Sequence, residues 1–167
     1  TSRDEIYKQL IADLVAAEEL VPWPNETAAT SNVERINKAF VKGFRARLML
    51  AASGYSQYPD GVRQSTDPDL SVANMYPQAL KECMDIIERY GESKLPSFEA
   101  TFLALNKENL SAAGESLWEI PFAEGRGRMH YTFAVRHRTS DKYTQQPQGG
   151  VAGPLPTVFY DFDELDT

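Results

Sequence analysis

Few residues of this chain have the types and spacing that catalysis or metal binding requires. Its two histidines, His130 and His137, lie seven residues apart in a stretch without helical periodicity, which matches no metal-ligand spacing. No nucleophile in a recognisable turn accompanies them. Asp161, Asp163 and Asp166 resemble a calcium loop only faintly, because the glycine that its sharp turn needs is missing. We therefore expect a binding protein rather than an enzyme, without a metal site or a cofactor.

Two segments combine aromatic rings with polar side chains, as carbohydrate sites do. Flat rings cover the apolar faces of a sugar, and neighbouring polar groups satisfy its hydroxyls. Packing in the core is the alternative for each ring. The candidate ligand-binding residues are Tyr55, Tyr58, Tyr131, Arg136 and Tyr143.

Composition limits the classes of function. The 167 residues suffice for one domain with a real core, and no apolar stretch is long enough to span a bilayer as a helix. The net charge of −7 argues against nucleic acid as a partner, because phosphate binding depends on clustered Lys and Arg. The single cysteine, Cys83, lies between Leu80 and Ile87 in a helical pattern, so we expect a buried thiol.

Two long helices are predicted in the first third of the chain. The first runs from about Arg3 to Leu20, with Ser2 and Glu5 at the spacing of a capping box. The second, within residues 35–55, has an apolar stripe that repeats every four residues. That stripe consists of Ile36, Phe40, Phe44 and Leu48, beside a smaller one of Ala39, Gly43, Ala46 and Leu50. Its basic residues, Arg35, Lys38, Lys42 and Arg45, are expected on a solvated face.

Gly54 is well placed to end the second helix. A loop of about twenty residues then leads to a third helix, which ends near Gly91. Its expected inward residues are Tyr76, Leu80, Cys83, Ile87 and Tyr90. Residues 98–106 predict a short helix, and residues 116–122 alternate as a strand would, with Trp118 expected in the core.

Two charged residues lie beside apolar stripes, Asp13 on the first helix and Arg47 on the second. A buried charge is costly unless it is paired. We therefore predict a buried ion pair between Arg47 and Asp13.

The order of these segments resembles the SusD/RagB family of outer-membrane nutrient-binding lipoproteins. The resemblance covers nearly the whole chain. It rests on IYKQLIADLVAAEEL, RINKAFVKGFRARLMLAASG, YPQALKECMDIIERYG, FEATFLALN, ESLWEIPF and PLPTVFYDFDELDT, in that order.

The resemblance implies a mainly α fold of tetratricopeptide-like helix pairs with long loop insertions and a short strand-containing region. Residues 1–167 would be a single domain fragment, helical to about residue 105 and irregular from about 106 to 167. Because members of the family are about three times as long and begin with an export signal ending in a lipid-bearing Cys, we expect an internal segment without its lipid anchor.

The implied function is non-catalytic binding of oligosaccharides at the cell surface, in the outer membrane, for import through a SusC-like, TonB-dependent transporter. Three alternatives stay open: a helical-repeat scaffold for a protein partner, peptide binding, and a glycoside hydrolase. A sequence alone does not reveal paired catalytic carboxylates.

Overall fold

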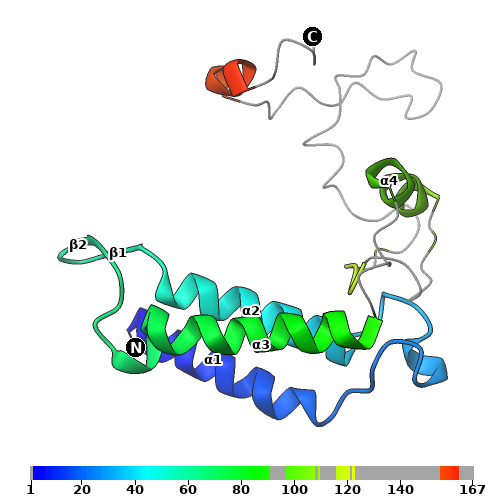
Figure 1. Ribbon diagram of the computed structural model, residues 1–167, viewed down its shortest axis with the longest axis horizontal. Coiled ribbons are helices and arrows are strands. Elements are labelled where there is room, and N and C mark those ends of the chain that lie inside the picture. Colours follow the sequence, from blue (N-terminus) through cyan, green and yellow to red (C-terminus); the bar gives the residue numbers. More distant parts are fainter. Residues whose placement is uncertain are drawn as a thin grey trace. The chain divides into compact units, whose positions relative to one another are not determined.

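The computed structural model describes residues 2–90, 97–107, 109, 116–120, 122 and 155–161. The chain divides into two compact units, Thr1–Ile120 and Pro121–Thr167. The described part is mainly helical, with four α-helices and one small antiparallel hairpin, which confirms the mainly α class (Figure 1). No described helix is long and apolar enough to cross a membrane.

Helix α1, Arg3–Glu18, begins at the predicted capping box. The amide of Glu5 donates to Ser2 Oγ at 3.2 Å, and the amide of Ser2 donates to Glu5 Oε2 at 2.7 Å. The helix has no fully buried residue. It packs on the core through the partly buried Tyr7 and Ile11, whereas Ile6 and Leu10 are exposed.

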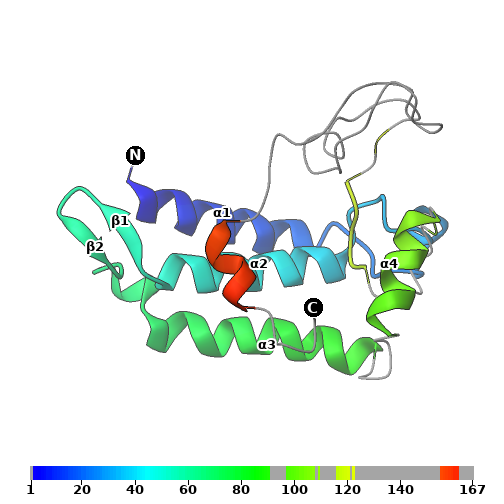
Figure 2. The same cartoon turned by 90° about the horizontal axis from the view of Figure 1, so that it is seen from above.

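Helix α2, Lys38–Ser53, is the middle helix of the bundle. The amide of Phe40 donates to Oδ1 of the N-cap residue Asn37 at 3.0 Å, and Gly54 ends the helix as predicted. Helices α1 and α3 contact α2 on either side, and consecutive helices run in opposite directions (Figure 2).

Helix α3, Val72–Tyr90, packs on α2 with a different face from the predicted one. Met75, Ala79 and Glu82 are buried, whereas the expected inward residues Tyr76, Leu80, Cys83 and Ile87 are exposed. The prediction of their burial, including the buried thiol, is wrong. The apolar residues of α3 cover a wide arc of the helix surface. The part of this arc with the small Ala79 lies against α2, and the neighbouring part with Leu80 does not.

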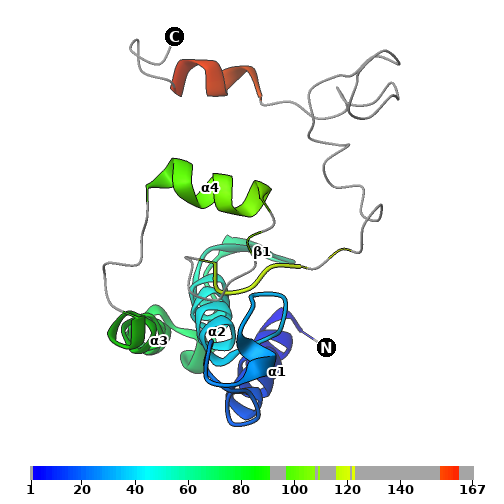
Figure 3. The ribbon, with the colours of Figure 1, turned by 90° about the vertical axis from the view of Figure 1, so that its right-hand side faces the viewer.

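The core is small. One cluster of its buried residues comes from α2, from α3 and from the short 3₁₀ helix η2, Pro68–Leu70. Its members are Ala46, Met49, Ala52, Leu70, Met75 and Ala79. The three helices are seen end-on in Figure 3.

The α2–α3 connection contains strands β1, Ser56–Tyr58, and β2, Gly61–Arg63. Tyr58 pairs with Gly61, so the turn consists of two residues, and Gly61 adopts a φ of +130° that favours glycine. Another 3₁₀ helix, η1, Ala28–Thr30, lies between α1 and α2.

Helix α4, Phe98–Asn106, forms where it was predicted. Among residues 116–122, the described ones, 116–120 and 122, form no strand, so that prediction is wrong. Residues 117–119 instead lie against the start of α2. The amide of Glu119 donates to the Val33 carbonyl at 2.9 Å, and the Trp118 ring lies 4.6 Å from that of Phe40.

Gly43 lies where Leu117 packs on α2. A Cβ on Gly43 of α2 would lie 3.0 Å from Leu117 Cδ1, so the glycine permits this close approach. Trp118 is half-buried rather than fully in the core.

In the second unit, Pro156–Asp161 forms the 3₁₀ helix η4.

Candidate functional site

Two clusters of polar side chains connect the helices. The first, here named the central ion cluster, consists of Glu18, Lys42, Arg45, Glu82 and Asp85. Lys42 Nζ lies 3.0 Å from Glu18 Oε1, 3.1 Å from Glu82 Oε2 and 2.8 Å from Asp85 Oδ2. Arg45 contacts Glu18 and, at 2.6 Å from Nη2 to Oε1, Glu82. The cluster therefore joins α1, α2 and α3 through charges.

Burial and pairing act in opposite directions on the pKa values of this cluster. Burial alone would raise the pKa of Glu18, but hydrogen bonds from Arg45 and Lys42 outweigh it and lower that pKa. The hydrogen bond from Lys42 is the main cause of the lowered pKa of Asp85. Burial would lower the pKa of Lys42, but its three carboxylate partners raise it. The pairs thus favour the charged forms of Glu18, Lys42 and Asp85.

The cluster corrects two predictions. Lys42 and Arg45 were expected on a solvated face, but both are buried, with Arg45 only 3% exposed. The predicted buried pair of Arg47 with Asp13 is also wrong. Arg47 is exposed, and Asp13 is exposed and accepts a hydrogen bond from Gln9 Nε2 at 2.7 Å. Two residues separate by about 200° around a helix, so burying Arg45 turns Arg47 outward.

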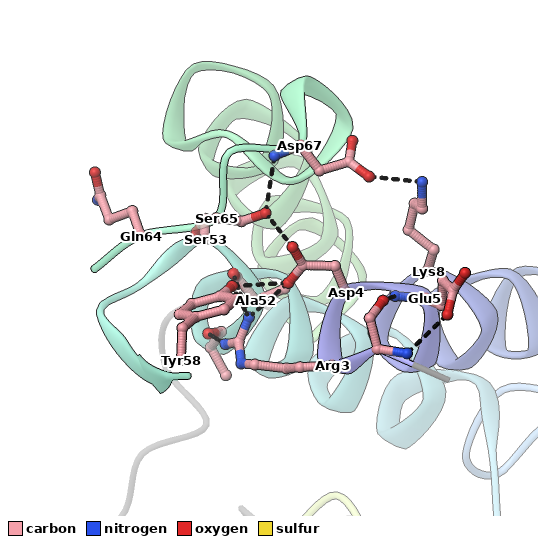
Figure 4. A network of polar contacts seen from close by, with 12 residues as sticks. Arg3, Asp4, Glu5, Lys8, Ala52, Ser53, Tyr58, Gln64, Ser65 and Asp67 are labelled. Atoms are coloured by element: carbon pink, nitrogen blue, oxygen red, sulfur yellow. Dashed lines mark hydrogen bonds and ion pairs between the residues drawn. The ribbon is translucent and has the colours of Figure 1, made fainter. Parts of the chain in front are cut away.

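The second cluster, here named the hairpin cluster, consists of Arg3, Asp4, Tyr58, Arg63 and Ser65. It joins the start of α1 to the β1–β2 hairpin (Figure 4). The Tyr58 hydroxyl donates to Asp4 Oδ1 at 2.7 Å and accepts from Arg3 Nη1 at 3.0 Å. Ser65 Oγ donates to Asp4 Oδ2 at 2.6 Å, so both oxygens of this carboxylate have partners.

Arginines and tyrosines alternate in a stack within and beside the hairpin cluster. Arg63 Cζ lies 3.9 Å from the centre of the Tyr58 ring, Arg3 Cζ lies 5.5 Å from it, and Arg3 lies 4.4 Å from the Tyr7 ring. Such cation–π contacts are each worth about 0.5–1 kcal/mol at exposed sites. Arg3 also donates to the Ala51 and Ala52 carbonyls at the end of α2. The hairpin is thereby fixed to α1 and α2.

Asp4 is the acceptor around which the hairpin cluster is arranged. Burial raises its pKa, but hydrogen bonds from Ser65, Tyr58 and Arg3 together lower it below the usual value. The carboxylate is therefore held in its charged form and has no role as a proton donor near neutral pH.

The structure places two of the five predicted ligand-binding residues. Tyr55 is 74% exposed just before β1, while Tyr58 is half-buried and its hydroxyl is used within the hairpin cluster. Tyr131, Arg136 and Tyr143 lie outside the described residues, as do His130 and His137. Asp60, the polar neighbour of the tyrosines, pairs with Arg63 at 2.9 Å.

Reasoning from the sequence missed Arg3 and Asp4, which meet Tyr58 across more than fifty residues of chain, and Ser65, whose hydroxyl donates to Asp4. No local signal marks such a contact. Within the described residues there is no cluster of three or more potential metal ligands. The hairpin cluster and the exposed Tyr55 give this part of the molecule a partly aromatic surface.

Comparisons of the chain with protein-family models, with curated proteins and with solved structures found no match.

Proposed function

We propose that the chain is part of a SusD/RagB-like nutrient-binding protein, which binds oligosaccharides without cleaving them. The ligand would pass to a SusC-like, TonB-dependent transporter in the outer membrane, on whose surface the protein would be held by a lipid anchor. The proposal rests first on the order of the six sequence segments that resemble the family. The three antiparallel helices agree with its helix pairs.

One structural observation supports a sugar site in particular. Tyr55 is exposed and directly precedes a hairpin that the hairpin cluster fixes to two helices, so its backbone has a fixed position. A fixed backbone reduces the conformational entropy that is lost when a sugar stacks on the ring. Arg63, Gln57 and Asp60 provide polar groups on the same hairpin.

The test is calorimetric titration with a panel of plant and host oligosaccharides, together with an assay for released reducing ends. We expect binding that Tyr55→Ala weakens, no cleavage, and retained binding in the matched control Tyr76→Ala, since Tyr76 is an exposed tyrosine on α3. Release of reducing ends that stops after a carboxylate substitution would contradict the binding-only function. If Tyr55→Ala and Tyr76→Ala bind oligosaccharide equally well, Tyr55 is not part of the binding site.

A further inference from the structure

An apolar groove lies along α2 and α3, apart from both polar clusters. Its volume is about 530 Å³, and it is lined by Leu50, Tyr76, Pro77, Ala79, Leu80 and Cys83. Leu80 is 63% exposed and Tyr76 50% exposed. Side chains of this size stay in contact with water unless another surface covers them, and contiguous apolar patches of this kind mark interaction sites.

The chemistry of the groove excludes a sugar as its occupant. Its lining contains no charged side chain, amide or carboxylate. A buried hydroxyl without a hydrogen-bond partner is costly, so an oligosaccharide would lose more from desolvation here than it gained. The occupant must itself present an apolar surface.

The spacing of the exposed residues identifies the shape of that surface. Tyr76, Leu80, Cys83 and Ile87 follow one another at steps of four, three and four residues, and each is exposed. Steps of four and three form the seam along which one helix packs on another at a shallow angle. The groove therefore fits an α-helix whose own apolar residues have the same spacing.

The groove also continues an interface that already exists. Ala79 is a member of the buried core between α2 and α3 and at the same time lines the groove. Leu50, from α2, forms part of the opposite wall. A helix lying in the groove would contact both helices and extend the layered packing by one element.

A charge at the rim of the groove indicates which polar residues the occupying helix should carry. Arg47 lies one turn before Leu50 on α2, is exposed, and has no ion pair within the described part of the chain. Residues three apart are neighbours on a helix surface, so Arg47 borders the groove. A carboxylate on the adjacent flank of the occupant would pair with it.

We propose that this groove is a docking site for an amphipathic α-helix of a partner protein, with leucine-like residues at steps of three and four and acidic residues on the flank facing Arg47. This interaction is separate from oligosaccharide binding. Leu80→Lys should therefore leave any oligosaccharide titration unchanged.

The test uses the full 167-residue chain and a labelled synthetic peptide with Leu at the two seam positions of each heptad and Glu on the flanks. Fluorescence anisotropy measures its binding. Leu80→Lys should weaken binding by about tenfold or more, because it places a charge in the groove. The matched control Leu20→Lys, at an 83% exposed leucine after α1, should change it by less than about twofold.

A second arm tests the charge at the rim. Replacing the Glu residues of the peptide by Lys should weaken binding to the unchanged chain by about threefold at low salt, and Arg47→Glu should reverse that preference. Far-UV circular dichroism verifies that each variant keeps its helices.

Three results would overturn the proposal. The first is binding no tighter than that of a scrambled peptide, and the second is equal binding by Leu80→Lys. The third is dimerisation in sedimentation velocity that Leu80→Lys abolishes while the peptide does not bind, which would assign the groove to a second copy of this chain.

Discussion

The central ion cluster and the hairpin cluster use the same chemistry in different surroundings. In both, arginine and carboxylate side chains join a helix to a segment distant in sequence. The Arg45 side chain is 3% exposed, whereas those of Arg3 and Arg63 are 22% and 34% exposed. Water can replace a lost partner at Arg3 or Arg63 more readily than at Arg45, Lys42 or Glu82, whose side chains are 3%, 7% and 10% exposed. The same type of contact should therefore contribute very differently to stability.

Their partners differ as well. Each charged group of the central ion cluster is held mainly by other charges on α1, α2 and α3. The hairpin cluster adds a tyrosine hydroxyl, a serine and aromatic faces. The first cluster is expected to determine whether the helices pack, and the second only where the hairpin lies.

The largest effect should come from removing Arg45. Arg45→Met leaves Glu18 and Glu82 with Lys42 as their remaining partner in the cluster, and breaking a buried pair costs about 3–5 kcal/mol. The matched control is Arg47→Met, on the same helix but exposed, which should stay within about 0.5 kcal/mol. Urea unfolding followed by circular dichroism measures both. Equal losses would contradict the central role of Arg45.

A double variant sharpens this prediction. Arg45→Met with Glu82→Met removes one charge of each sign, so the net charge of the cluster is unchanged. We expect it to be less destabilised than the sum of the single variants, with a coupling of about 0.5–3 kcal/mol. Additive losses would show that the two residues act independently.

Low pH should have the next largest effect on the free energy of unfolding. Glu18 and Asp85 have folded pKa values below their ordinary values of 4.5 and 3.8. A lowered carboxyl pKa stabilises the fold above the unfolded pKa, and the contribution is lost as pH falls through the folded value. The free energy of unfolding should therefore decrease below about pH 4.5, and less steeply in Arg45→Met, where Glu18 has lost a partner. Urea unfolding at successive pH values measures this decrease in both proteins. Parallel curves of unfolding free energy against pH for the unchanged chain and Arg45→Met would contradict the role given to Glu18.

The smallest effect should come from the hairpin cluster. Tyr58→Phe removes the hydroxyl that joins Asp4 to Arg3 but keeps the ring beneath Arg63, so we expect a loss of about 1 kcal/mol. The control is Tyr55→Phe at the exposed neighbour, which should have almost no effect. Thermal unfolding measures both. A loss as large as that of Arg45→Met would show that the two clusters do not differ.

Local signals in the sequence predicted the helices well. The capping box at Ser2 and the stop at Gly54 depend on residues that are near each other in the chain, and both are confirmed. Residues 98–106 have a helical pattern and form α4.

The faces of the helices were predicted poorly, for a physical reason. Periodicity assumes that the most apolar face is buried, but α3 buries Glu82 and exposes Leu80. Glu82 faces inward because Arg45 and Lys42 on α2 meet it there, a contact 37 to 40 residues apart in the chain. Arg45 and Arg47 are the same type of residue, and no local pattern distinguishes the buried one. The hairpin cluster was missed for the same reason.

The side-chain amide of Asn37 also has a consequence for the order of folding. Its oxygen caps α2 locally, while its nitrogen donates to the Leu117 carbonyl at 2.8 Å and so closes a loop of 80 residues. Closing a long loop costs entropy that local helix capping does not. Asn37→Ser can keep the cap but not the long-range bond, so it should accelerate unfolding more than it slows refolding. Trp118, whose ring is in tilted contact with that of Phe40, gives the kinetic experiment a fluorescent reporter at the site of docking.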